Sequence, residues 1–316
     1  MNYNIVNFDD EIGKYLESLD LKEITKRSYA KILTTFTRYL KVRFILLPSK
    51  KDILDYKDYL AKSVRSASIQ KTIVVLRGFF TYLDSEGIYK NIMIGIKGAK
   101  IEPTFKREAF SLTDLKRIVD LAKSKSDSLI GLRNYAIILL MVTTGLRTIE
   151  IERASISDLS SIKGRRLLYV QGKGSDDKDN YVKLSSEVFS VITDYLIKRN
   201  DDLEPLFITH GTNHLNNRIQ TRTIRGVVKE YLRQIGIDDK RYTAHSLRHS
   251  VATNLIKYGN VTLEEAKQVL RHKDIKTTQI YNHAVIRSEN EGELIMSKLI
   301  LESDGDIDEW FNRVWR

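Results

Sequence analysis

The residues of this chain that could act together on a phosphate lie in its second half. They are two arginines, a lysine, two histidines and a late tyrosine: Arg147, Lys173, His245, Arg248, His272 and Tyr281. Arginines hold phosphate oxygens in two-point contacts, and a tyrosine hydroxyl can attack phosphorus as a nucleophile. A positioned lysine or histidine can supply the proton that a leaving oxygen needs. The set therefore contains the groups required to cleave a phosphodiester without a metal ion.

Arg147 ends the run Thr144-Gly145-Leu146-Arg147, and Glu150 follows three residues later. A lone arginine after such a run is more often a surface residue or an ion-pair partner. Together with the rest of the set, the sequence of this run favours a catalytic Arg147, whose planar guanidinium can hold two phosphate oxygens. We interpret Glu150 as the carboxylate that orients Arg147 or the loop that carries it.

His245 and Arg248 are three residues apart, so on a helix both can point at a single phosphate. A DNA-contacting helix without catalysis is the alternative. His249 is displaced by about 100° around such a helix and is predicted to be structural. His245 with His249, and His210 with His214, have the spacing of metal ligands. Neither pair has the glutamate of a His-Glu-x-x-His site or a convincing third ligand, so no metal site is predicted.

Lys173 lies in Gly172-Lys173-Gly174, at the tip of a predicted β-hairpin. A flexible ammonium there could reach into a DNA groove and donate a proton to the departing oxygen. Lys178, five residues later in the same hairpin, is the rival. Lys173 is favoured because Gly172 and Gly174 let the backbone turn tightly around it.

The last motif runs from Leu270-Arg271-His272 through Thr277-Thr278 to Tyr281. In the order of its residues and in the sequences of its motifs, the whole set resembles the tyrosine recombinases, a family of DNA integrases and resolvases. The resemblance implies that Tyr281 cleaves DNA to leave a 3′-phosphotyrosine link and a free 5′-hydroxyl. It also implies that the hairpin lysine protonates the 5′ oxygen, and that no ATP, metal or other cofactor takes part.

The family pattern is Leu-Gly-His where this chain has Leu270-Arg271-His272. A helix end that usually exploits the positive φ of glycine must therefore take a side chain here. The change removes no catalytic group, and Arg271 could add a phosphate contact. We include it among the candidate DNA-binding residues, which are Lys26, Arg27, Lys71, Arg77 and Arg271.

The first part of the chain is predicted to be helical. Apolar residues recur at helical spacing over 25–40 and 69–83, and 50–62 forms a more charged helix between them. We expect Ser68 to cap the last of these helices and Gly87 to end it. The aromatic residues of these helices are most simply core. By resemblance, this part is a small all-helical, SAM-like core-binding domain that clamps one face of the DNA duplex.

The fold class predicted for the whole chain is mainly α, in two domains. The expected organisation is a core-binding domain over 1–98, a linker over 99–109, a catalytic domain over 110–287 and a tail over 288–316. The catalytic domain should be mostly helical, with a small antiparallel sheet of strands 167–170 and 181–184. The chain begins directly at the core-binding region, which is typical of the simple two-domain recombinases.

Composition is consistent with a nucleic-acid partner. The net charge is +11, and residues 288–316 hold 3 Lys/Arg against 8 Asp/Glu, so the rest of the chain carries +16. A basic body favours a polyanion because each neutralised phosphate releases counterions. The absence of cysteine excludes disulfides and thiolate chemistry. With no signal peptide and no apolar stretch of about 18 residues, we expect a cytoplasmic protein without membrane contact.

The resemblance implies double-stranded DNA with inverted-repeat core sites as the partner, and a tetramer that exchanges strands through a Holliday junction. The role could be integrase, transposase or resolvase of a mobile element, or Xer-type resolution of chromosome dimers. A catalytically silent DNA-binding accessory protein is the alternative from a different class. Trp310, Phe311 and Trp315 stand in the acidic tail, which we expect to dock either on a neighbouring subunit or on its own catalytic domain.

Overall fold

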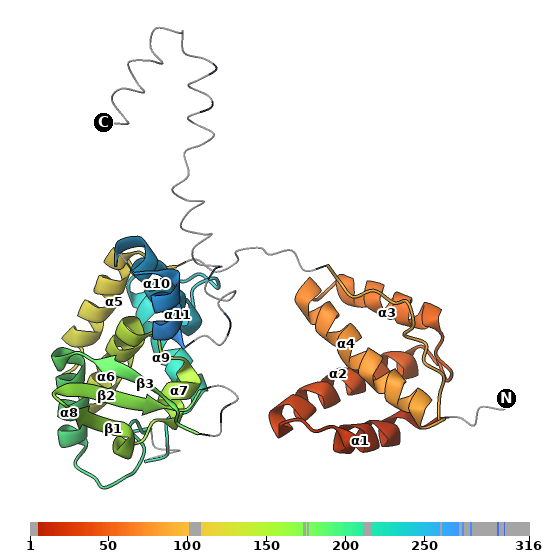
Figure 1. The fold of residues 1–316 in the computed structure, drawn as a ribbon, viewed down its shortest axis with the longest axis horizontal. Coiled ribbons are helices and arrows are strands. Elements are labelled where there is room, and N and C mark those ends of the chain that lie inside the picture. The colour runs from red at the N-terminus through yellow and green to blue at the C-terminus, as the bar shows by residue number, and fades with distance from the viewer. Residues whose placement is uncertain are drawn as a thin grey trace. The chain divides into compact units, whose positions relative to one another are not determined.

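The chain folds into two compact units, Met1–Thr104 and Phe105–Arg316 (Figure 1). The division falls inside the segment 99–109 that is predicted as a linker. The structure, a computed structural model, describes residues 6–100, 109–172, 175, 177–210, 216–259, 261–271, 274, 279, 296 and 300. Apart from Met296 and Ile300, the predicted tail therefore lies outside the described residues.

The first unit is all-helical, as predicted. Its helix α4 packs against the other three helices of the unit. The bounds are α1 Phe8–Ser18, α2 Glu23–Val42, α3 Lys50–Ala61 and α4 Ser66–Ser85. Most of the aromatic residues predicted as core are buried, and Phe36, Phe79 and Phe80 are fully inaccessible to solvent, whereas Tyr29 and Tyr82 are half-buried and Tyr59 is 48% exposed. The helical spacing of the apolar residues thus produces one core shared by four helices.

The two ends of α4 differ in how well local sequence predicts them. Ser68 does not cap the helix, because the helical backbone extends to Ser66 and the N–H of Ser68 already bonds to the carbonyl of Arg65 at 2.8 Å. The stop at Gly87 is confirmed. Gly87 has φ +67, a conformation that side-chain-bearing residues rarely adopt, so the chain leaves the helix there.

The second unit is built around one buried helix. The elements are α5 Leu112–Ser124, α6 Leu129–Thr144, α7 Thr148–Arg153, a 3₁₀ turn Ile156–Asp158, α8 Ser186–Arg199, α9 Thr221–Gln234, α10 Ala244–Tyr258 and α11 Leu263–Leu270. Helix α6 is apolar on all sides, which is typical of a helix surrounded by others. It contacts α5, α8, α9, α10 and the sheet. Packing on all sides therefore holds the C-terminal end of α6 in place, together with the start of the segment that follows it.

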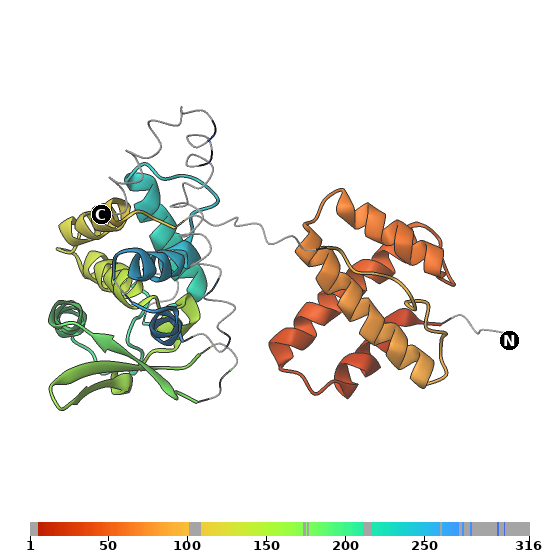
Figure 2. The same ribbon diagram turned by 45° about the horizontal axis from the view of Figure 1, so that its top comes forward.

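A small antiparallel sheet of order β1-β2-β3 lies along one side of this unit, with α8 against it (Figure 2). Its strands are β1 Leu159–Ile162, β2 Arg165–Val170 and β3 Asn180–Leu184. The sequence predicts only β2 and β3. Strand β1 has four residues, two of them serine, so its alternation is too short to detect. The Lys163-Gly164 turn, with φ +50 and +76, is the local signal for the extra hairpin.

The predicted fold class is confirmed: the second unit is mostly helical and carries a small antiparallel sheet. A side-chain cap fixes the start of α5, because the Ser111 hydroxyl oxygen accepts from the N–H of Asp114 at 3.0 Å. Over the part of the chain that the structure describes, no helix is both long and apolar enough to cross a membrane.

Candidate active site

Arg147 stands at a sharp junction between two helices. Helix α6 ends at Gly145, whose left-handed backbone (φ +63, ψ 24) turns the chain away from the helix axis. Arg147 is extended (φ −76, ψ 150) and directly precedes α7. The buried helix and the glycine turn therefore fix the backbone position of Arg147, while its side chain stays 26% exposed.

Glu150 holds Arg147 by both its backbone and its side chain. One carboxylate oxygen, Oε2, accepts from the N–H of Arg147 at 2.8 Å. The other, Oε1, accepts from Nη1 of Arg147 at 2.7 Å. The carboxylate is 1% exposed. The contact expected between Glu150 and Arg147 is thus present, and an orienting role in catalysis stays a prediction.

Glu150 stays ionised although it is buried. Burial by itself raises the pKa of a carboxyl group. Here the charge of Arg271, the N–H of Arg147 and the charges of Arg147 and Arg248 outweigh burial, so the pKa of Glu150 is lowered. A charged carboxylate beneath the surface is therefore stable only because guanidinium groups reach it from three parts of the chain.

Arg248 is a fully buried side chain of α10, 1% exposed. Its Nη1 donates to the carbonyl of Gly145 at 2.5 Å, and its Nη2 donates to the carbonyl of Leu270. It thereby joins the end of α6 to the end of α11. His245 lies one turn earlier on α10 and is exposed. Its ring meets that of His249 edge to face, with centroids 4.6 Å apart.

Arg271 caps the C-terminus of α11 with a left-handed backbone, φ +53 and ψ 47. The expectation that a side chain occupies a positive-φ helix end here is confirmed. The side chain is 8% exposed, and its Nη2 donates to Oε2 of Glu150 at 3.1 Å. Burial lowers the pKa of the Arg271 guanidinium, while Glu150 opposes that shift. A DNA contact by Arg271 stays a prediction.

Three of these groups line an open cavity of about 1250 Å³. Arg147, Glu150 and Arg271 contribute to it, and so do strand β3, the base of the β2–β3 hairpin and one face of α11. The cavity is open to solvent, and its lining is of mixed charge: it includes the basic residues Arg147, Lys183, Lys267 and Arg271 and the acidic residues Glu150, Asp179, Glu264, Glu265 and Asp274.

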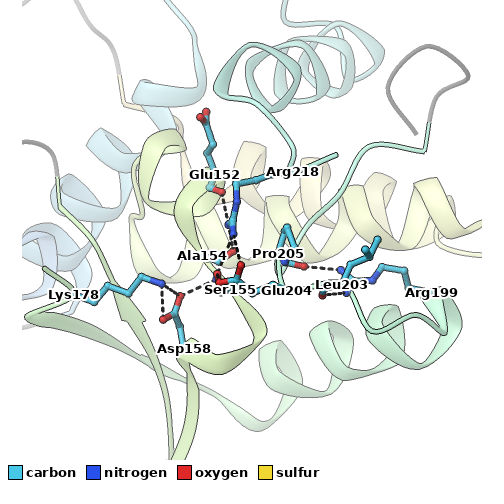
Figure 3. A network of polar contacts seen from close by, with 10 residues as sticks. All are labelled: Glu152, Ala154, Ser155, Asp158, Lys178, Arg199, Leu203, Glu204, Pro205 and Arg218. Carbon is cyan, nitrogen blue, oxygen red and sulfur yellow. Dashed lines mark hydrogen bonds and ion pairs between the residues drawn. The ribbon is translucent and has the colours of Figure 1, made fainter. Parts of the chain in front are cut away.

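The base of the β2–β3 hairpin is held on two sides. Nη1 of Arg153, at the end of α7, donates to the carbonyl of Gly172 at 3.2 Å. Lys178 points toward Asp158 and donates to both its carboxylate oxygens, at 2.6 and 2.7 Å (Figure 3). The rival lysine is therefore engaged in an ion pair with a buried carboxylate. Lys173 itself lies outside the described residues.

The Asp158 ion pair belongs to a larger polar network beneath the hairpin. Oδ2 of Asp158 accepts from the N–H of Ser155 at 2.8 Å. Arg218 donates to the carbonyls of Glu152 and Ala154 and to the hydroxyl of Ser155 (Figure 3). This network fixes the segment after α7, and no local sequence motif signals the part that Arg218 makes, because Arg218 lies about sixty residues from its partners.

His272 and Tyr281 also lie outside the described residues, as does His214. His210, the other member of that pair, has Nε2 at 3.0 Å from the hydroxyl of Tyr195. Where the chain is described, no three His, Cys, Asp or Glu side chains gather as metal ligands would.

The structure brings three of the candidate DNA-binding residues of the first unit to neighbouring helix starts. Nζ of Lys71, in α4, donates to the hydroxyl of Ser28 in α2 at 2.6 Å. Lys26 and Arg27 precede Ser28 directly on α2. Arg77 lies further along α4, and its Nη2 donates to the carbonyl of Ile96 at 2.8 Å.

Known proteins resemble this chain in sequence and in fold. Residues 109–286 match the phage integrase family. Tyrosine recombinase XerD of Listeria innocua serovar 6a is 28% identical over 288 residues, which covers 87% of this chain and 93% of XerD. XerH site-specific recombinase, solved after cleavage on palindromic difH substrate, superposes with a TM-score of 0.72 at 20% identity, covering 94% of this chain and 92% of XerH.

An integrase also shares this fold. The lambda integrase tetramer bound to a Holliday junction superposes with a TM-score of 0.64 at 20% identity, covering 88% of this chain and 78% of that protein. The phage integrase match alone spans more than half of this chain. It includes every predicted catalytic residue, from Arg147 to Tyr281. The chain therefore belongs to the phage integrase family and is a tyrosine recombinase, a site-specific DNA recombinase.

Proposed function

We propose that this recombinase cleaves DNA with Tyr281 while Arg147 and Arg248 bind the scissile phosphate, which requires Arg248 to exchange a backbone carbonyl of Gly145 or Leu270 for a phosphate oxygen. The observation that carries the proposal is the buried, ionised Glu150, which holds Arg147 at the edge of an open cavity. An arginine with a fixed backbone and a partly exposed guanidinium can meet a phosphate with little loss of conformational entropy. His245 and His272 complete the phosphate site and handle protons.

The reaction exchanges one phosphodiester bond for another. The Tyr281 oxygen attacks phosphorus, the bond between phosphorus and the 5′ oxygen breaks, and Lys173 gives that oxygen a proton. The phosphotyrosine link keeps the energy of the phosphodiester, so the free 5′-hydroxyl can reverse the step on another strand. Neither ATP nor a metal ion is needed, because guanidinium groups neutralise the developing charge.

The substrate is double-stranded DNA that carries inverted-repeat core sites, bound by four copies of this chain. The basic balance of residues 1–287 supports a polyanionic partner. The XerH complex with difH substrate and the lambda integrase tetramer on a Holliday junction support the same partner and assembly.

The biological role that we propose is integrase, transposase or resolvase of a mobile element. Xer-type dimer resolution is the second candidate, and the likeness to XerD over most of both chains favours it. The DNA around the gene separates the two roles. Flanking attachment repeats and mobile-element genes support the first, and a lone inverted-repeat site elsewhere in the chromosome supports the second.

A nicked suicide substrate tests the chemistry. After cleavage the short 5′-hydroxyl fragment diffuses away, so the enzyme is trapped on its DNA. Wild-type protein should form the covalent complex in EDTA as well as in magnesium, whereas Tyr281→Phe should bind the same DNA and form none. Covalent capture by Tyr281→Phe would identify another nucleophile and overturn the assignment.

A further inference from the structure

Arg147 and Arg271 share one carboxylate. Oε1 of Glu150 accepts from Nη1 of Arg147 at 2.7 Å, and Oε2 accepts from Nη2 of Arg271 at 3.1 Å. Arg271 lies 121 residues after Glu150, so the contact joins the start of α7 to the end of α11. Two arginines, on different elements, therefore depend on the same buried acid.

The charges of this cluster decide what a phosphate meets. Glu150 is 1% exposed, so water screens its charge poorly. Arg147 and Glu150 alone form a pair with no net charge, which would attract an anion weakly. With Arg271, the three bonded residues carry a net charge of +1, and the charge of the buried Arg248 adds to the positive potential at Glu150.

Arg271 occupies its place at a conformational cost. Its φ of +53 lies in the left-handed region, where glycine is the usual residue and a long side chain is strained. Its guanidinium is also buried at 8% exposure. The family pattern has glycine at this position, which avoids both costs. A strained, buried arginine in place of glycine indicates a function for the side chain in this protein.

We propose that Arg271 is a positioning residue for DNA cleavage. It neutralises Glu150, so that the carboxylate can hold Arg147 in place while Arg147 still offers its positive charge to the scissile phosphate. The inference rests on the proposed function, since it requires that Arg147 binds the phosphate. Arg271 acts through Glu150 and needs no contact with the DNA.

Single-turnover cleavage of the nicked substrate, at saturating DNA, tests the proposal with four variants. Arg271→Met and Arg271→Gly should slow cleavage about 10- to 100-fold, less than the roughly 10² to 10³ of a donor that touches the reacting group. Arg271→Lys, which keeps the charge, should stay within about fivefold of wild type. DNA affinity should change little in all of them.

The double variant Arg271→Met with Glu150→Gln separates charge from structure. If Arg271 serves to offset Glu150, removing both charges should restore part of the cleavage that Arg271→Met loses. A purely structural role predicts the opposite, since the double variant loses two sets of contacts. Thermal unfolding identifies variants that do not fold. Arg271→Gly relieves the positive-φ strain, so it tests the loss of the Arg271 charge in a backbone that is not strained.

Three results would overturn the inference. They are wild-type cleavage by Arg271→Met, a double variant no faster than Arg271→Met, and a loss confined to DNA affinity with a smaller salt dependence, which would make Arg271 a direct phosphate contact. Failure of the wild-type protein to capture the substrate would instead overturn the proposed function, and this inference with it.

Discussion

Glu150 is the carboxylate to which both Arg147 and Arg271 are bonded. Its pKa is lowered by guanidinium charges that outweigh burial, so its contribution to folding is fully present above the ordinary value of 4.5 and is lost as the pH falls through its lower folded value. Acid should therefore weaken the cluster by protonating the carboxylate. Acid weakens the cluster, and does not strengthen it, because the pKa of Glu150 is lowered in the folded protein.

Glu150→Gln should destabilise the second unit by about 3 kcal/mol at pH 7, since it leaves two arginines without their buried counter-charge. Urea unfolding at pH 7 and at pH 3 measures this, and the difference from wild type should shrink at the lower pH. Glu187→Gln, at an exposed carboxylate in the first turn of α8, is the matched control and should change stability far less. An unchanged difference at both pH values would contradict the role of Glu150 ionisation.

The two hairpin lysines should differ in what their loss affects. Lys173→Met should reduce cleavage by about 10² to 10⁴, the range for a lost general acid, without changing the unfolding temperature. Lys178→Met should instead lower the unfolding temperature, because Asp158 loses its ion pair, and should keep most of the cleavage. A suicide substrate and thermal unfolding measure both effects. The reverse pattern would make Lys178 the proton donor.

At the scale of elements, the end of α6 positions both arginines of the proposed phosphate site. Gly145 supplies the left-handed turn before Arg147, and its carbonyl accepts from Arg248. A Cβ at this position would lie 3.0 Å from Cδ2 of Leu270 and 3.5 Å from Cγ1 of Val251. The turn is therefore also where α6 meets α10 and α11 most closely.

Gly145→Ala should cost about 1 to 2 kcal/mol from backbone strain and slow cleavage, because the turn that precedes Arg147 shifts. Gly226→Ala is the matched control. Gly226 lies inside α9 with open space around its Cα, so alanine should raise stability there by about 0.5 to 1 kcal/mol. Chemical denaturation and the suicide substrate measure both. Equal effects of the two substitutions would show that the turn at Gly145 does not require glycine.

At the scale of the whole molecule, the acidic, aromatic end of the chain has an opposite charge to the basic remainder. Removing residues 303–316 should reveal how it acts. Docking on a neighbouring subunit predicts normal binding of one protomer to a half-site but no paired complex of two DNA sites. Docking on its own catalytic domain predicts faster cleavage. Gel-shift and cleavage assays distinguish the two, and unchanged behaviour in both would exclude a docking role.

The sequence by itself determined the family and most of the elements. Helical spacing and the helix stop at Gly87 are local features, so a short stretch of sequence is enough to predict them. The motif from Arg147 to Tyr281 identified the family for the same reason, since each part of it is a short run of residues. The sequence did not predict strand β1, because four residues are too few to show the alternation of a strand. It placed the cap of α4 three residues too late, at Ser68 instead of Arg65, because so short a stretch carries little periodicity.

Only the tertiary structure decided how the site is held together. Arg271 reaches Glu150 from 121 residues away, and Arg248 reaches the carbonyl of Gly145 from 103. No spacing rule connects such partners, because their proximity depends on how α6, α10 and α11 pack. The sequence shows that Arg271 departs from the family glycine, but only the fold places its charge on the carboxylate that also holds Arg147.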